Sequence, residues 1–216
     1  MKTLDLKKQL KPLYSPSAKR AEIIRIPPMR FAAIDGAIEK GREPGTSPAF
    51  AETMQALYGI AYTLKFMLKK RKKNPIDYPV MALEGLWWVR GGRFVITKKD
   101  NWLFTVIIMQ PDVITPDIFE AARVELLRKR GENPAVGRLR LETFDEGLCV
   151  QVMHIGPYAE EPATIGRMQA YAEENGYRDC VGLGGKHHEI HLGDPRRADP
   201  SKLRTVLRHP VEKIRS

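Results

Sequence analysis

The residues best suited to chemistry are a glutamate and its histidine neighbours near the C-terminus. Glu189 lies in the apolar and histidine-rich run 187–191, HHEIH. In a β-strand, alternation places His187, Glu189 and His191 on one face, where both histidines are expected to contact a ligand. A half-buried carboxylate near aromatic rings has its pKa raised by desolvation, and it can neutralise a cationic ligand or act as a base toward water. The alternative is a surface glutamate on an edge strand beside Lys186.

A second carboxylate, Glu84, lies in the apolar run 80–88, VMALEGLWW. Alternation aligns Glu84 with Trp88 and not with Trp87, so Trp88 is its expected pocket companion. The competing interpretation is that both tryptophans fill the core and the sheet edge, as most tryptophans in strands do. The sequence leaves both interpretations open, and either Glu84 or Glu189 could be the base.

Three further aromatic residues could bind a flat or cationic ligand. Trp102 and Tyr62 offer ring faces that can stack on a planar molecule or hold a cation. Tyr158 follows Gly156 and Pro157 at a predicted strand-to-helix corner, and it is a candidate proton donor.

The histidines next to Glu189 raise the question of a metal site, because imidazole and carboxylate are common metal ligands. No further cysteine or histidine cluster completes a coordination sphere in the sequence, so no metal is predicted. The glycine-rich run 182–185 precedes a predicted strand and not a helix, which argues against a nucleotide site. We therefore expect no cofactor.

Periodicity and turn residues predict the elements that must position these side chains. Strands are expected at 22–26, 31–38, 80–90, 102–110, 138–142, 148–155, 187–192 and 203–208. Helices are expected from 48 to about 72, and at 115–130 and 162–175. The order strand, helix, two strands occurs twice, which predicts an α+β fold of one domain, 1–216, with pseudo-repeats at about 20–112 and 113–211.

Composition narrows the class of protein. The 216 residues are 43% hydrophobic and 29% charged, which is typical of a globular protein. No run approaches the roughly 18–20 apolar residues of a membrane-spanning helix, and the N-terminal residues lack the apolar core of a signal peptide. A cytoplasmic protein is expected, with its two isolated cysteines, Cys149 and Cys180, reduced.

The formal net charge of +10 would attract polyanions. Much of that charge lies in residues 65–73, KFMLKKRKK, at the end of a predicted helix, where cations are favourable. Because no helix-turn-helix, zinc-finger or RNA-binding pattern accompanies it, specific nucleic-acid binding is not expected.

Several motifs together resemble one family. They are residues 152–158 (VMHIGPY), 175–177 (NGY), 187–197 (HHEIHLGDPRR), 84–88 (EGLWW) and 205–211 (TVLRHPV). This combination is similar to the GyrI-like domain family, in the stand-alone branch that carries no DNA-binding module. One departure is His191, where many relatives have a tyrosine.

The resemblance implies a fold of two strand-helix-strand-strand units related by pseudo-two-fold symmetry, with helices on one sheet face and a ligand groove on the other. It also implies that Glu189 lies in the ligand pocket and that the site contains no metal. Some members of the stand-alone branch hydrolyse cyclopropane-containing toxins that alkylate DNA.

The preferred hypothesis is therefore an enzyme that binds flat aromatic or cationic xenobiotics and opens an activated cyclopropane with water activated by Glu189 or Glu84. The alternative is a non-catalytic protein that sequesters drugs or senses ligands, in which the glutamates act only as counter-charges. The sequence predicts neither the natural substrate nor the oligomeric state.

Overall fold

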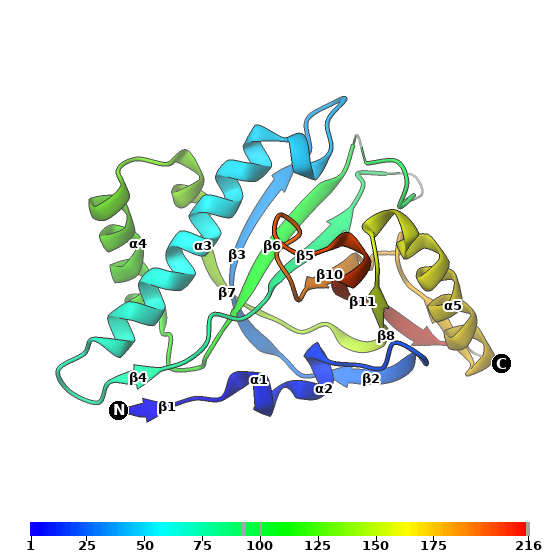
Figure 1. The fold of residues 1–216 in the computed structure, drawn as a ribbon, viewed down its shortest axis with the longest axis horizontal. Coiled ribbons are helices and arrows are strands. Elements are labelled where there is room, and N and C mark those ends of the chain that lie inside the picture. Colours follow the sequence, from blue (N-terminus) through cyan, green and yellow to red (C-terminus); the bar gives the residue numbers. More distant parts are fainter. Residues whose placement is uncertain (92–93, 100, 215–216) are drawn as a thin grey trace.

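Strands from both halves of the chain form one large antiparallel sheet (Figure 1). The computed structural model describes residues 1–91, 94–99 and 101–214. Along the sheet the strands follow the order β2-β8-β11-β10-β5-β6-β3-β7, and β9 pairs with β11. Their bounds are β2 Glu22–Ile26, β3 Met29–Ala37, β5 Leu83–Trp88, β6 Leu103–Gln110, β7 Arg140–Phe144, β8 Gly147–Ile155, β9 Tyr177–Asp179, β10 His187–His191 and β11 Arg204–Lys213.

The sheet order is symmetric about its central pair, β5 and β10. Strands β11 and β8 follow on one side, and β6 and β3 follow on the other. This order confirms the predicted α+β class. It also agrees with two equivalent units in the chain, but the division of one domain into pseudo-repeats stays a prediction. In the central pair, Glu189 lies opposite Gly85, and Ile190 lies opposite Glu84.

Two long helices cover one face of the sheet, α3 (Pro48–Lys69) over β3 and β6, and α5 (Glu161–Glu174) over β8. The central strands β5 and β10 lie between them (Figure 1). Helix α3 begins as predicted, since the Ser47 hydroxyl accepts a hydrogen bond from the Phe50 amide at 3.0 Å and proline takes the first turn. A third helix, α4 (Pro116–Arg130), packs against α3.

The N-terminal segment covers the other face. It forms two single-turn helices, α1 (Leu6–Gln9) and α2 (Lys11–Tyr14), which are too short for sequence periodicity to detect. The Tyr14 hydroxyl donates a hydrogen bond to Glu84 at 2.6 Å, and Arg208 donates one to the Leu13 carbonyl at 2.7 Å. The groove expected on this face is therefore the place where the chain's own N-terminus packs.

The remaining differences from prediction lie at element ends and in very short elements. Strand β11 continues past the predicted end at 208, because its last residues pair with β9, a three-residue strand that was not predicted. Short elements of two to five residues were also not predicted: β1 Lys2–Thr3, β4 Ile76–Asp77, and the 3-10 helices Pro44–Thr46, Pro134–Arg138, Tyr158–Glu160 and Pro200–Lys202. Within the described residues, no helix combines the length and the hydrophobicity needed to cross a membrane.

Candidate functional site

The two candidate glutamates point to opposite faces of the sheet. Directly opposed residues of an antiparallel pair share a face, and neighbours along a strand do not. Glu84 therefore shares the N-terminal face with Ile190, whereas Glu189 and Gly85 share the face between α3 and α5. A single pocket can use only one of these carboxylates.

Glu189 lies at one end of a buried chain of hydrogen bonds. Its Oε1 is 2.9 Å from His187 Nε2, and His187 Nδ1 is 2.7 Å from His209 Nε2. His209 Nδ1 in turn lies 2.6 Å from Asp179 Oδ2. Burial disfavours the charged form of Glu189, but the hydrogen bond from His187 and the nearby Lys99 ammonium outweigh it. They lower the pKa of Glu189 to about 2, whereas desolvation was expected to raise it.

A second carboxyl group, Glu161 at the start of α5, adjoins this chain. Its side chain is 2% exposed, and its Oε1 has no hydrogen-bond partner among the described residues. Burial and the nearby charge of Glu189 raise the pKa of Glu161 to about 9. At neutral pH the site thus holds one carboxylate, Glu189, beside one protonated carboxyl, Glu161, and such a pair is able to act as base and acid.

Aromatic rings cover the same region. Trp87 and Trp102 are buried with their ring centroids 5.2 Å apart, and Phe94 stacks on Trp102 at 5.0 Å. Both indole N–H groups lack a partner among the described residues. Gly85 makes room for one of them, because a Cβ there would lie 2.7 Å from Trp87 Nε1. The unpartnered Trp87 N–H lies on the face of the sheet that Glu189 shares with Gly85, and it is suited to a ligand that supplies an acceptor.

The predicted proton donor Tyr158 and the predicted ligand residue His191 extend the chain from the second carboxylate oxygen of Glu189. The Tyr158 hydroxyl lies 3.4 Å from His191 Nδ1, and His191 Nε2 lies 3.5 Å from Glu189 Oε2. Burial raises the pKa of Tyr158 to about 12 and lowers the pKa of His191. Tyr158 therefore holds its proton at neutral pH and is able to donate it.

The same cluster contains the atoms that could hold a metal ion. Glu161, His187 and Glu189 each bring one ligand-type atom within 4.8 Å of the others. Two carboxylates and an imidazole suit a divalent metal. However, His187 Nε2 already contacts Glu189 at 2.9 Å, and a metal would need that nitrogen free of hydrogen. The contacts favour a hydrogen-bonded cluster.

On the opposite face, Glu84 belongs to a closed charge network. It accepts hydrogen bonds from Tyr14 and from His188 Nε2 at 3.0 Å, and His188 Nδ1 contacts Glu146 at 2.8 Å. Burial alone lowers the pKa of His188, but Glu146 and Glu84 outweigh it and raise that pKa to about 9. Burial likewise disfavours ionised Glu146, yet His188 and Arg208 lower its pKa to about 2. Glu84 is fully buried, and its contacts hold the N-terminus on the sheet.

The remaining predicted ligand residues are not brought to the Glu189 cluster. Trp88 faces the Glu84 side, where the Lys186 ammonium lies 3.7 Å from its ring centroid. Tyr62 is 47% exposed on α3 and stacks on Phe66. Trp87, which sequence alternation separated from Glu84, is the tryptophan that faces Glu189.

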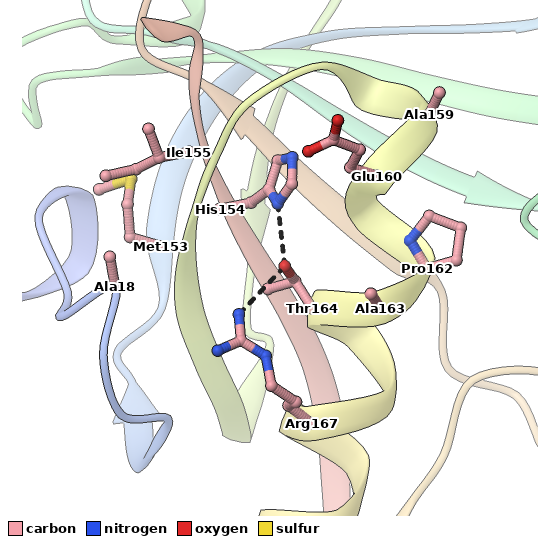
Figure 2. A pocket seen from close by; sticks show the side chains of 10 residues that line it. All are labelled: Ala18, Met153, His154, Ile155, Ala159, Glu160, Pro162, Ala163, Thr164 and Arg167. Carbon is pink, nitrogen blue, oxygen red and sulfur yellow. Dashed lines mark hydrogen bonds between the residues drawn. The ribbon is translucent and has the colours of Figure 1, made fainter. Parts of the chain in front are cut away.

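Two surface cavities flank these sites. The larger, about 570 Å³, lies at the start of α5 (Figure 2). Three of its polar groups bond to one another, since the Thr164 hydroxyl contacts both His154 and Arg167. No predicted site residue lines it. The smaller, about 290 Å³, is lined in part by Tyr14 and His191. His191 therefore connects the Glu189 chain to a cavity at the surface.

Comparison with known proteins agrees with the sequence motifs and the fold. Residues 21–212 match the model of the GyrI-like small molecule binding domain. The chain belongs to the GyrI-like family. A search of curated proteins found no match.

Three solved structures from Listeria innocua are similar to this GyrI-like chain over nearly its whole length. An uncharacterised conserved protein is 40% identical, with a TM-score of 0.87, and covers 97% of this chain and 100% of its own. Two proteins described as hydrolases are 36% and 37% identical, with TM-scores of 0.82 and 0.83. They cover 97% and 98% of this chain, and 100% of their own.

Sequence reasoning missed four residues of the cluster: Glu161, His209, Asp179 and Phe94. In the sequence, Glu161 resembles any acidic residue at the start of a helix. His209 lies just beyond the predicted end of its strand. Asp179 belongs to an unpredicted strand, and Phe94 to a connecting segment. The quoted motif TVLRHPV contains His209, but its position beside His187 depends on strand pairing.

Proposed function

We propose that this GyrI-like protein binds flat aromatic or cationic xenobiotics against the Glu189 cluster and hydrolyses activated cyclopropane-containing toxins that alkylate DNA. Glu189 is the general base that activates water. The observation that carries the proposal is the buried pair of carboxyl groups, Glu161 and Glu189, whose oxygen atoms lie within 4.8 Å of each other beside buried aromatic rings.

The aromatic contacts support a flat ligand. Phe94 stacks on Trp102 and also on His187, with a ring distance of 5.6 Å and an interplanar angle of 29° to His187. The Phe94 ring thus occupies a position in which a planar ring can stack on both Trp102 and His187. A ligand ring that replaced Phe94 would stack on the same partners and lie close to Glu189.

The reaction balances with groups of this cluster. Glu189 removes a proton from water as the water oxygen bonds to a cyclopropane carbon. The carbon–carbon bond of the strained ring breaks, and its electron pair moves into the conjugated carbonyl that activates the ring. That oxygen is then protonated, and both Glu161 and Tyr158 hold a proton at neutral pH. The aromatic enclosure keeps bulk water away from the reacting atoms.

Similar structures support hydrolysis as the reaction class, since two of the Listeria innocua proteins are described as hydrolases at 36% and 37% identity. The second candidate is a non-catalytic binder of cations. It is favoured by Lys99, whose ammonium lies 5.7 Å from the Trp102 ring centroid and whose charge acts on both Glu161 and Glu189. A cationic ligand could take the place of that ammonium.

The test is incubation of the purified protein with a cyclopropane-bearing DNA alkylator, with products followed by mass spectrometry. The wild type should form a water adduct, Glu189→Gln should bind the compound without forming it, and Glu84→Gln should retain turnover once its folding has been checked. Saturable binding without any water adduct would favour the cation binder. Turnover lost in Glu84→Gln but kept in Glu189→Gln would refute the assignment of the base.

A further inference from the structure

We infer that Asp179 and His209 are positioning residues that hold His187 as an Nε2–H donor to Glu189. The inference rests on the proposed role of Glu189 as base, but it concerns contacts that exist in the free protein. His209 on β11 is buried and Asp179 on β9 is partly buried, and neither side chain touches the reacting atoms.

The hydrogen bonds of this chain fix how many hydrogens its ring nitrogens carry. Three contacts join Glu189 to His187, His187 to His209 and His209 to Asp179, at 2.9, 2.7 and 2.6 Å. Each needs one hydrogen between its two atoms. If both carboxylates are ionised, all three hydrogens belong to ring nitrogens. Two neutral imidazoles carry only two, so the histidine pair holds one extra proton.

The surroundings decide which ring is charged. Burial lowers the pKa of His187, which is fully enclosed. Burial disfavours the ionised form of the Asp179 carboxylate, but its contact with His209 favours that form more strongly. The pKa of Asp179 is therefore lowered. The extra proton therefore resides on His209. The His209 imidazolium donates from Nε2 to His187 Nδ1, which leaves His187 neutral with its hydrogen on Nε2.

The consequence reaches Glu189. Because His187 can only donate from Nε2, Glu189 Oε1 is fixed as an acceptor and Glu189 stays ionised. The other oxygen, Oε2, is left to take a proton from water. Asp179 is itself held by donors, since Gln169 Nε2 lies 2.7 Å from Oδ2 and the Val181 amide lies 2.8 Å from Oδ1.

Other titratable groups act on the chain from the surrounding elements. They are Glu161 from α5, Lys99 from the segment after β5, Tyr158 before α5, His191 on β10, and His188 on the opposite sheet face. Their charges shift the pH at which the pair loses its proton. They leave unchanged the number of hydrogens that the three contacts require.

The direct test is ¹⁵N NMR of the histidine rings in the wild-type protein between about pH 6 and 8, around the ordinary histidine pKa. We expect His209 to be doubly protonated and His187 to carry its hydrogen on Nε2 alone. Two neutral rings that both carry Nδ1–H would mean a protonated Glu189 and would overturn the inference. So would loss of the His187 Nε2–H signal on stoichiometric uptake of added Zn²⁺, which would show a metal site instead.

The variant test uses Asp179→Asn, with the exposed Asp117→Asn as its matched control. Loss of the carboxylate charge should lower the pH at which the histidine pair loses its extra proton by about 1 to 3 pH units. If the protein is a hydrolase, the alkaline limb of its kcat/KM profile should move by the same amount, and Asp117→Asn should change neither. An unchanged NMR titration in folded Asp179→Asn would refute the role of Asp179. The wild-type spectrum decides the question if Asp179→Asn does not fold, and it does so whether or not the protein turns over any substrate.

Discussion

Removal of the Tyr14 hydroxyl, on the face of the sheet that the N-terminal segment covers, should destabilise the protein without affecting its ligand binding or turnover. In Tyr14→Phe, the buried Glu84 carboxylate loses the hydrogen bond that it accepts at 2.6 Å and keeps only the one from His188. Glu84 is fully buried, so water cannot replace the lost donor.

The expected cost is about 1.5–3 kcal/mol, the usual range for a hydrogen bond to a charged group. For a protein of this size, each kcal/mol lowers Tm by about 2–4 °C, so a drop of roughly 3–12 °C should be seen in thermal unfolding. The matched control is Tyr62→Phe, which removes a hydroxyl from a ring that is 47% exposed and should change stability by less than about 0.5 kcal/mol.

Ligand binding and turnover at saturating ligand should be the same in Tyr14→Phe as in the wild type, because the affected network lies across the sheet from Glu189. Equal Tm values for Tyr14→Phe and Tyr62→Phe would refute the structural role given to Glu84. A loss of turnover in a Tyr14→Phe protein that is still folded at the assay temperature would mean that Glu84 takes part in the reaction.

Three further outcomes are expected. Gly85→Ala places a Cβ 2.7 Å from Trp87 Nε1, so it should lower the free energy of unfolding in urea by about 1–3 kcal/mol and weaken ligand binding measured by tryptophan fluorescence. Phe94→Ala frees the position that a flat ligand would take. It should raise the affinity for such a ligand, measured by calorimetry, by about 2- to 10-fold, because one aromatic pair contributes about 0.5–1.5 kcal/mol. Weaker binding would mean that Phe94 contacts the ligand. In the folded protein the pKa of His188 is raised to about 9, above its unfolded value of about 6.5. Its contribution to stability should therefore be complete below about pH 6.5 and be lost as the pH rises to about 9. His188→Gln should remove that part of the pH dependence of stability.

Local patterns were sufficient to place most of the architecture. The two-residue period of the apolar runs located β5, β6, β8 and β10, and the Ser-Pro and Thr-Pro starts located α3 and α4, because these signals depend on a few neighbouring residues. They also predicted that His187, Glu189 and His191 share a face, which the strand register confirms. Short elements such as α1 and β9 carry too few residues for any period.

What alternation cannot decide is which face of a strand meets which partner. The sequence set Glu84 and Glu189 apart as unusual carboxylates, yet only the pairing of β5 with β10 shows that they lie on opposite sides of the sheet. The same pairing brings Trp87 to Glu189 in place of Trp88.

The composition of the cluster around Glu189 was likewise a matter of tertiary structure. Asp179, His209 and Glu161 come from β9, β11 and α5, and each looks ordinary in its own segment. The hydrogen bond between His209 and Asp179 and the pKa shifts of Asp179 and Glu161 arise because burial removes water and leaves each group only its neighbours as partners. The sequence by itself determined which residue types and which strands were available, whereas long-range strand pairing and burial decided which of them form one site.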